Sequence, residues 1–222
     1  MENYRVIEVK EAVRANNDRR ADELRAKLKA RGQLLINLMS SPGSGKTTVL
    51  ARTIEALSGE MKIAVMEADI DSDVDAAAIS ATGAKVIQLH TGGMCHLDAS
   101  MCEQGLDGLD AHEADLIVLE NVGNLVCPAE FDTGAAVNAT ILSVPEGDDK
   151  PLKYPLMYQV CDVVLVNKID VLPYFDFDLD ACRANVEKRH PGARVIPVCA
   201  KTGEGMDEWY RWLRDQVAAH KA

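Results

Sequence analysis

The sequence predicts an α/β fold, with a doubly wound and mostly parallel sheet flanked by helices and a further helix at the N-terminus. Short runs rich in Val, Ile and Leu recur along the chain, and several lack the apolar–polar alternation of a half-exposed strand. Such continuous runs are typical of strands buried on both faces of a parallel sheet. Helical stretches lie between many of the runs, as parallel connections require. A chain of 222 residues with 47% hydrophobic residues is long enough to bury the core of such a domain.

The first expected element is a helix over residues 11–31, which are rich in Ala, Leu, Arg and Lys. Leu24 and Leu28 stand one helical turn apart, and Gly32 follows as a stop signal. We therefore expect residues 1–32 to form a helical extension that precedes the main domain.

The remaining elements alternate between strands and helices. The last helix is expected near 206–219, because apolar residues recur there at helical spacing and form one core-facing stripe. The residues of this stripe are Met206, Trp209, Tyr210, Leu213 and Val217. Strands are expected at 33–39, 62–67, 84–89, 115–120, near 139–144, 162–167 and 193–198.

The charge balance disfavours two classes of partner. The net charge of −11 repels phosphate backbones and anionic lipid, so we expect no nucleic acid and no membrane as partners. No apolar run approaches the roughly 20 residues that span a bilayer, and no basic-then-apolar leader opens the chain. We therefore expect a cytoplasmic protein, in which the six cysteines are reduced thiols or metal ligands.

A phosphate-binding loop is predicted by "LINLMSSPGSGKTTVL" at 35–50, which runs from a buried strand through a glycine-rich turn into a helix. Glycines let backbone N–H groups converge on an anion, and the helix directs its positive end at the same point. Lys46 can reach the β and γ phosphates and act in catalysis, while the Thr47 hydroxyl can bind Mg²⁺. Ser40 stands where the usual motif has its first glycine. The candidate nucleotide-binding residues of this loop are Gly43, Ser44, Gly45, Lys46, Thr47 and Thr48.

Guanine is the base that the next motifs favour. In "VVLVNKID", the Asp170 carboxylate can accept from N1–H and the 2-amino group of guanine, whereas adenine leaves it unpaired. Lys168 can cover the ring with its methylenes, and Asn167 can tie loops together. "VCAKTG" at 198–203 follows the next strand and offers the backbone N–H of Ala200 to guanine O6. The candidate base-site residues are Asn167, Lys168, Asp170, Cys199, Ala200 and Lys201.

Acidic residues follow two further strands. "MEADIDSDVD" at 66–75 holds Asp69, Asp71, Asp73 and Asp75, and "LENVGN" at 119–124 holds Glu120 and Gly123. Carboxylates placed there can hold Mg²⁺, and a glycine lets the backbone approach the γ-phosphate. We expect Thr47, Asp69, Asp75 and Glu120 at the magnesium site, Glu120 and Gly123 at the nucleotide, and Asp75 in catalysis. No glutamine is evidently placed to orient water, so we expect slow hydrolysis.

The stretch "TGGMCHLDASMC" at 91–102 sets Cys95 beside His96. Taken alone, this Cys-His pair is explained at least as well by a buried thiol next to an incidental histidine as by part of a metal site. Cys127 adds a third potential ligand, because both loops follow parallel strands and should leave the same edge of the sheet. Thiolates with an imidazole suit Zn²⁺ or Ni²⁺, and three ligands leave a tetrahedral shell open for a second subunit, a water or a client. Cys102, Cys161, Cys182 and Cys199 lack such partners, so we expect them to be mostly structural.

Five motifs together resemble the HypB family of hydrogenase-maturation GTPases, over nearly the whole chain: "NLMSSPGSGKTT", "TGGMCHLDASM", "ENVGNLVCPAEFD", "SVPEGDDKPLKYP" and "VNKIDVLPY". The resemblance implies a P-loop NTPase fold with a GTPase domain at 33–222, GTP or GDP with Mg²⁺, and hydrolysis of GTP. It implies nickel delivery to [NiFe]-hydrogenase, with accessory maturation proteins and the hydrogenase large subunit as partners.

The resemblance also implies a GTP-dependent homodimer in which Cys95, His96 and Cys127 bind Ni²⁺ or Zn²⁺ near the subunit interface. It places Lys153 near the nucleotide or the dimer interface. Some family members carry a Cys-rich or His-rich nickel motif near their start. In this sequence no cysteine precedes Cys95 and no histidine precedes His90, so we do not expect N-terminal nickel storage.

Three alternatives remain at this stage. A urease-type nickel-delivery GTPase has a Cys-Pro-His motif, whereas here Cys95 and His96 are adjacent. A partitioning-type ATPase of similar architecture would not need the guanine motif around Asp170. A metal-buffering module without enzymatic activity would not need an intact phosphate loop.

Overall fold

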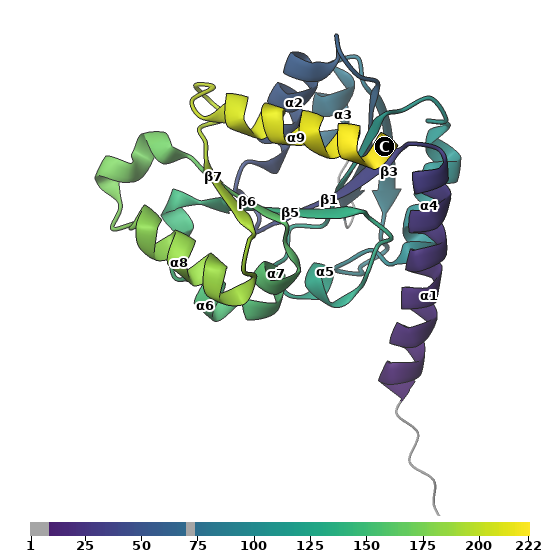
Figure 1. Cartoon of the computed structure of the whole chain (residues 1–222), viewed down its shortest axis with the longest axis horizontal. Helices are drawn as coiled ribbons and strands as arrows, with labels where there is room; N and C mark the ends of the chain where they lie inside the picture. The colour runs from purple at the N-terminus through teal and green to yellow at the C-terminus, as the bar shows by residue number, and fades with distance from the viewer. Residues whose placement is uncertain (1–8, 70–73) are drawn as a thin grey trace, which may run out of the picture.

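The computed structural model describes residues 9–69 and 74–222, and these form one seven-stranded sheet flanked by helices (Figure 1). The strand order is β3-β2-β4-β1-β5-β6-β7, and every neighbouring pair is parallel. The predicted doubly wound sheet is confirmed. The strands are β1 (Leu34–Ser40), β2 (Ile63–Asp69), β3 (Lys85–His90), β4 (Leu116–Glu120), β5 (Val137–Ser143), β6 (Val163–Asn167) and β7 (Arg194–Pro197).

Helices connect these strands and cover both faces of the sheet. The α-helices are α1 (Val9–Ala30), α2 (Lys46–Leu57), α3 (Val74–Ser80), α4 (Ala99–Leu109), α5 (Cys127–Glu130), α6 (Lys150–Lys153), α7 (Pro155–Val160), α8 (Leu179–Arg189) and α9 (Met206–Lys221). Two short 3-10 helices are η1 (Val144–Glu146) and η2 (Ile169–Tyr174). No helix in the described ranges has both the length and the apolar character needed to cross a bilayer.

The alternation of side chains along each buried strand supplies two apolar layers. In β1, Leu34 and Ile36 face α2 and α9, whereas Leu35 faces α1 and α4. All seven residues of β1 are buried, which explains its unbroken apolar run. Towards the other edge of the sheet, α7 and α8 complete the second layer by packing on β5 and β6 (Figure 1).

The C-terminal helix α9 packs as predicted with one exception. Met206, Trp209, Leu213 and Val217 are buried against β1 and α2. Tyr210 is only half-buried at the margin of this contact. Its hydroxyl donates to the carbonyl of α2 residue Arg52 at 3.2 Å, so it borders the stripe instead of filling it.

The N-terminal helix α1 lies along α4 (Figure 1). Leu24 and Leu28 are 4% and 3% exposed, so the two leucines that predict this helix do bury against the domain. Helix α1 therefore belongs to the same hydrophobic core as α4 and the strands beneath it, although it precedes residue 32 in the sequence.

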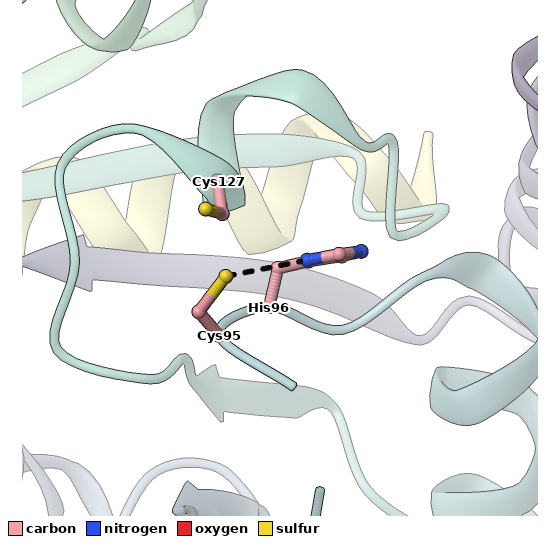
Figure 2. A group of neighbouring side chains, drawn as sticks. All are labelled: Cys95, His96 and Cys127. Atoms are coloured by element: carbon pink, nitrogen blue, oxygen red, sulfur yellow. Dashed lines mark hydrogen bonds between the residues drawn. The ribbon is translucent and has the colours of Figure 1, made fainter. Parts of the chain in front are cut away.

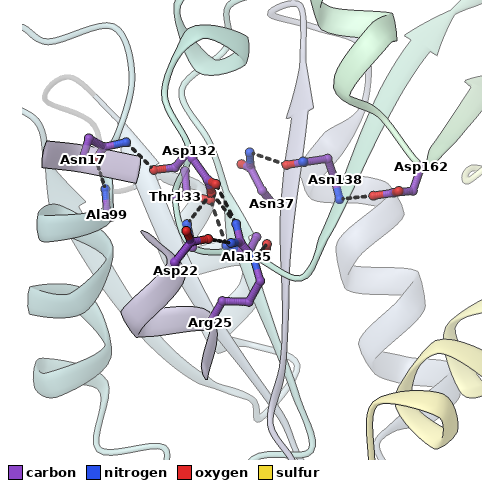
Figure 3. A network of polar contacts seen from close by, with 11 residues as sticks. Asn17, Asp22, Arg25, Asn37, Ala99, Asp132, Thr133, Ala135, Asn138 and Asp162 are labelled. Carbon is purple, nitrogen blue, oxygen red and sulfur yellow. Dashed lines mark hydrogen bonds and ion pairs between the residues drawn. The ribbon is translucent and has the colours of Figure 1, made fainter. Parts of the chain in front are cut away.

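Three asparagines, two of them buried and Asn138 half-buried, form a hydrogen-bonded ladder across the middle of the sheet. Asn121, directly after β4, donates to Asn37 of β1 at 3.0 Å. Asn37 in turn donates to Asn138 of β5 at 3.0 Å, as Figure 3 shows. These amides satisfy one another among buried side chains that are mostly apolar.

Candidate functional site

The phosphate loop lies where β1 ends and α2 begins. Gly45 has a φ of +98°, and a Cβ built on it would approach Asn167 Nδ2 to 2.6 Å, so only glycine fits this turn. Gly43 also has a positive φ, of +74°. No side chain caps the amino end of α2, which leaves its first backbone N–H groups available to an anion.

Asn167 joins this loop to the loop after β7. It is 3% exposed, and its Nδ2 donates to the Ser44 carbonyl at 2.9 Å. Its Oδ1 accepts from the backbone N–H of Ala200 at 3.1 Å, which is the loop-tying role that the sequence suggests. This N–H is the one expected to meet guanine O6. A contact with O6 would require the bond to Asn167 to be shared or exchanged.

The other base-site candidates surround this link. Lys168 has a left-handed backbone, with a φ of +63°, and its Nζ donates to the Gly43 carbonyl at 2.7 Å. Asp170 lies at the start of η2, and its side chain is exposed. Lys201, beyond β7, is also exposed, whereas Cys199 is buried. The exposed Asp170 carboxylate lies two residues after Lys168, which contacts the phosphate loop, and it can accept hydrogen bonds from a guanine edge.

The magnesium candidates meet beside the phosphate loop. The Thr47 hydroxyl donates to Glu120 Oε1 at 3.2 Å, and Lys46 Nζ lies 4.0 Å from the same oxygen. Glu120 is 2% exposed, and its Oε2 has no partner in the described part of the chain. A buried carboxylate with an unused oxygen, next to a threonine hydroxyl, fits the oxygen ligands that Mg²⁺ prefers.

A buried glutamate that the sequence reasoning missed lies next to Glu120. Glu67 ends the run "IAVME" of β2 and is 3% exposed. It is the register partner of Glu120 on the neighbouring strand β4. Burial raises the pKa of Glu67 far above the usual glutamate range, and the charge of Glu120 raises it further. Burial also raises the pKa of Glu120, whereas the Lys46 ammonium and a hydrogen bond from Glu67 oppose that shift. Glu67 is therefore the protonated partner, and the available signal was a charged residue at the end of an apolar strand.

The remaining acidic candidates lie close by. Asp69 ends β2, and Asp75 is exposed in the first turn of α3, where its charge raises the pKa of Glu120. Asp71 and Asp73 lie outside the described residues. Gly123 packs against the phosphate loop, since a Cβ there would approach the Pro42 ring to 3.2 Å.

Two more predicted nucleotide residues lie away from these contacts. Thr48 is exposed in the first turn of α2. Lys153 lies on α6, where its Nζ pairs with Asp149 at 2.5 Å. Among the described residues, no hydrogen bond or ion pair joins Lys153 to the phosphate loop.

The three predicted metal ligands come together at the same edge of the sheet (Figure 2). Cys95 and His96 follow β3, and Cys127 begins α5 after β4. One ligand atom from each lies within 4.8 Å of the others, and Cys95 Sγ is 3.9 Å from His96 Nδ1. All three are half-buried, so a metal ion can enter from solvent.

The electrostatics of this cluster favour a cation. Hydrogen bonding to Cys127 raises the pKa of Cys95, and burial and the charge of the second thiolate raise it further. Two adjacent thiolates are thus disfavoured unless a positive ion lies between them. Burial lowers the pKa of His96, which keeps the imidazole neutral and able to donate a lone pair. Its ring stacks on Phe131 with centroids 4.0 Å apart.

The other cysteines are buried and free of disulfides. Burial raises the pKa of Cys102 and Cys161 strongly, and that of Cys182 to about 12. Cys161 donates its thiol to the Met157 carbonyl. Neutral buried thiols of this kind fill space and do not bind metal.

Comparisons with known proteins give the family. Residues 34–197 match the model of the CobW/HypB/UreG nucleotide-binding domain. The chain is 50% identical to hydrogenase maturation factor HypB of Azotobacter vinelandii over 212 residues, which cover 96% of this chain and 70% of that protein. It is 46% identical to HypB of Escherichia coli K12, over 99% of this chain and 76% of the relative. The crystal structure of HypB from Helicobacter pylori in complex with nickel is 36% identical and superposes with a TM-score of 0.87, covering 93% of this chain and 97% of that one. The chain therefore belongs to the HypB hydrogenase maturation factors of the CobW/HypB/UreG family.

Proposed function

We propose that this protein is a GTP-hydrolysing metallochaperone that helps deliver nickel during [NiFe]-hydrogenase maturation in the cytoplasm. The observation that carries the proposal is the placement of two sites at one edge of the sheet. The phosphate loop follows β1. Cys127 follows β4, the strand next to β1, and Cys95 and His96 follow β3, which β2 separates from β4.

GTP is the proposed nucleotide. The positive end of α2 would hold the phosphates, with Lys46 at the β and γ phosphates. The exposed Asp170 would accept from the guanine edge while Asn167 fixes the loops on either side.

Mg²⁺ would supply charge for phosphate transfer, held by Thr47 and Glu120 with Asp69 and Asp75 nearby. Glu67 would keep its proton and donate to Glu120, so that the negative charge of the pair stays on the ligand. Asp75 is the proposed catalytic carboxylate. Because no glutamine is evidently positioned to orient water, hydrolysis is proposed to be slow.

Nickel is the proposed cargo, and zinc suits the same donors. Two thiolates and a neutral imidazole leave one position of a tetrahedral shell open. Two exposed apolar residues, Met94 at 45% and Val126 at 52%, precede Cys95 and Cys127 directly. An open metal shell with an apolar rim supports a homodimer that closes over this site, near which maturation partners would collect the metal.

Nucleotide and metal are proposed to influence each other through one segment. Glu120 and Gly123 lie beside the phosphate loop, and Cys127 follows them in the chain. A γ-phosphate that orders this segment would move one thiolate relative to the other two ligands. By reciprocity, metal must then change the relative affinity for GTP and GDP by the same factor.

The test is a titration of Ni²⁺ and Zn²⁺ into the purified protein with GDP and with a non-hydrolysable GTP analogue, while light scattering follows the mass. We expect tighter binding of guanine than adenine nucleotides, a dimer with the analogue, and loss of metal binding in Cys95→Ala and Cys127→Ala. Equal use of ATP would contradict the base assignment. Unchanged metal affinity in both variants would contradict the metal site.

A further inference from the structure

One buried side chain of helix α1 contacts both segments that follow the proposed metal ligands. Asn17 is 7% exposed although it lies on a helix with many charged residues. Its Oδ1 accepts from the backbone N–H of Ala99 at 3.0 Å, and its Nδ2 donates to the backbone carbonyl of Asp132 at 2.9 Å (Figure 3).

Each of these bonds ends close to a ligand. Ala99 begins α4 and stands three residues after His96, and Asp132 stands five residues after Cys127. The two loops follow different strands and are joined by no short stretch of chain. The distance between the Cys127 thiol and the other two ligands therefore depends on what holds the loops together across space.

Other contacts of α1 strengthen the grip on the Cys127 side. Arg25 binds both carboxylate oxygens of Asp132 at 2.8 and 2.7 Å and donates to the Ala135 carbonyl at 3.0 Å. Arg14 pairs with Glu130 at 3.1 Å. The stack of His96 on Phe131 joins the loops directly, next to Asp132.

We propose that Asn17 is a positioning residue for the metal site: its amide ties the Cys95–His96 loop to the Cys127 segment and sets the spacing of the three ligands. The proposal rests on the metal site of the proposed function. Asn17 touches no metal. It acts by holding the ligands near their binding arrangement, so that less ordering is needed when the ion arrives. Residues that hydrogen-bond the ligands themselves typically contribute about 10–100-fold to metal affinity, and for Asn17, which bonds the backbone near the ligands, we expect the lower end of this range.

The experiment compares Asn17→Ala with two matched variants of the full chain. Asn16→Ala removes the neighbouring asparagine of α1, which is exposed and contacts Arg19. Gln33→Ala removes an equally buried amide that donates to Ala111 and Ala114 at the opposite edge of the sheet. The second control costs stability without touching either ligand loop. Arg25→Ala releases only the Cys127 side and leaves Asn17 in place.

Metal affinity is measured by competition between the protein and a chromophoric chelator for Zn²⁺ and Ni²⁺, and urea unfolding of the same samples gives the stability. We expect Asn17→Ala to bind metal about tenfold more weakly than wild type, and Arg25→Ala to weaken it in the same direction. Asn16→Ala and Gln33→Ala should keep wild-type affinity, even though Gln33→Ala unfolds at lower urea. Metal should also slow hydrogen exchange at the Ala99 amide in wild type and not in Cys127→Ala.

Wild-type affinity in Asn17→Ala, or an equal loss in Gln33→Ala, overturns the proposal. If Asn17→Ala does not fold, Arg25→Ala decides, and wild-type affinity in that variant overturns it. A wild-type protein that binds no metal, or a Cys127→Ala variant that binds as tightly, shows instead that the metal site itself is wrong.

Discussion

Replacing Asn167 with alanine should damage stability and nucleotide binding together. The side chain is 3% exposed and makes two buried hydrogen bonds to backbone groups, one to the Ser44 carbonyl and one from the Ala200 N–H. The alanine side chain can neither donate to the Ser44 carbonyl nor accept from the Ala200 N–H. Both backbone groups would remain buried without these partners, at the two loops that the proposed nucleotide contacts.

The magnitude follows from these two bonds. Each buried group left without a partner costs roughly 1–3 kcal/mol, so losing both partners in Asn167→Ala should lower the free energy of unfolding by about 2–6 kcal/mol. If a tenth of the loosened molecules hold the phosphate loop correctly, affinity for GDP should fall about tenfold, which corresponds to about 1.4 kcal/mol. Asn167→Asp should keep the acceptor for Ala200 and place an oxygen against the Ser44 carbonyl, so its defect should fall mainly on the phosphate loop.

The assay is urea unfolding with and without GDP, beside a fluorescent-GDP titration of the same samples. Asn185→Ala is the control, because its half-buried amide makes one longer bond of 3.4 Å, to the Asp148 carbonyl. It should cost less than about 1 kcal/mol and leave GDP affinity unchanged. An Asn167→Ala protein as stable as Asn185→Ala would refute the argument from the two buried bonds. A destabilised protein with full GDP affinity would refute the link to the nucleotide.

Three further predictions concern the site. Asp170→Asn should weaken GTP binding by up to several kcal/mol while leaving unfolding almost unchanged, because Asp170 is exposed; equal GTP affinity in a competition assay would contradict the guanine contact. Metal affinity should fall as pH falls, because the pKa of Cys95 is raised and metal binding must displace a proton from this thiol. Calorimetry in buffers of different ionisation enthalpy should show this proton release, and Cys127→Ala should reduce it. Glu67→Gln should stabilise the nucleotide-free protein near neutral pH. The folded pKa of Glu67 is raised, so stability from its proton is complete below the unfolded pKa and is lost as pH rises towards the folded value; a gain that is constant from pH 4 to 8 would contradict this assignment.

The sheet was predictable because its strands are buried on both faces. β1, β4 and β6 are wholly buried runs, and their observed limits fall within a residue or two of the expected ones. β5 begins at Val137, earlier than expected. In the sequence Asn138 is only a polar residue that interrupts the apolar run, whereas in the structure its side chain is bonded to Asn37 within the strand. Polar residues that are satisfied inside a core look like loop residues in a sequence.

The site was predictable where motif and strand end coincide, and not where contacts span the chain. Cys95, His96 and Cys127 meet because parallel strands end at one edge. Glu67 was overlooked because its environment comes from β4, the strand beside its own. Asn17 gives no local signal at all, since both of its partners are more than 80 residues away.

The asparagine ladder also fixes the register of β1 against β4 and β5, because its hydrogen bonds form in only one alignment of these strands. Parallel strands with continuous apolar runs could shift by two residues and still present the same faces to both layers. Such a misaligned sheet would separate Asn37 from Asn138 and Asn121 and leave amides unpaired in the core, which costs roughly 1–3 kcal/mol for each group. It would also carry Glu120, the residue before Asn121, about 6.6 Å along the sheet, at about 3.3 Å per residue. A misaligned sheet would then differ from the native one in function as well as in energy, because the carboxylate proposed to bind magnesium would lie in the wrong place.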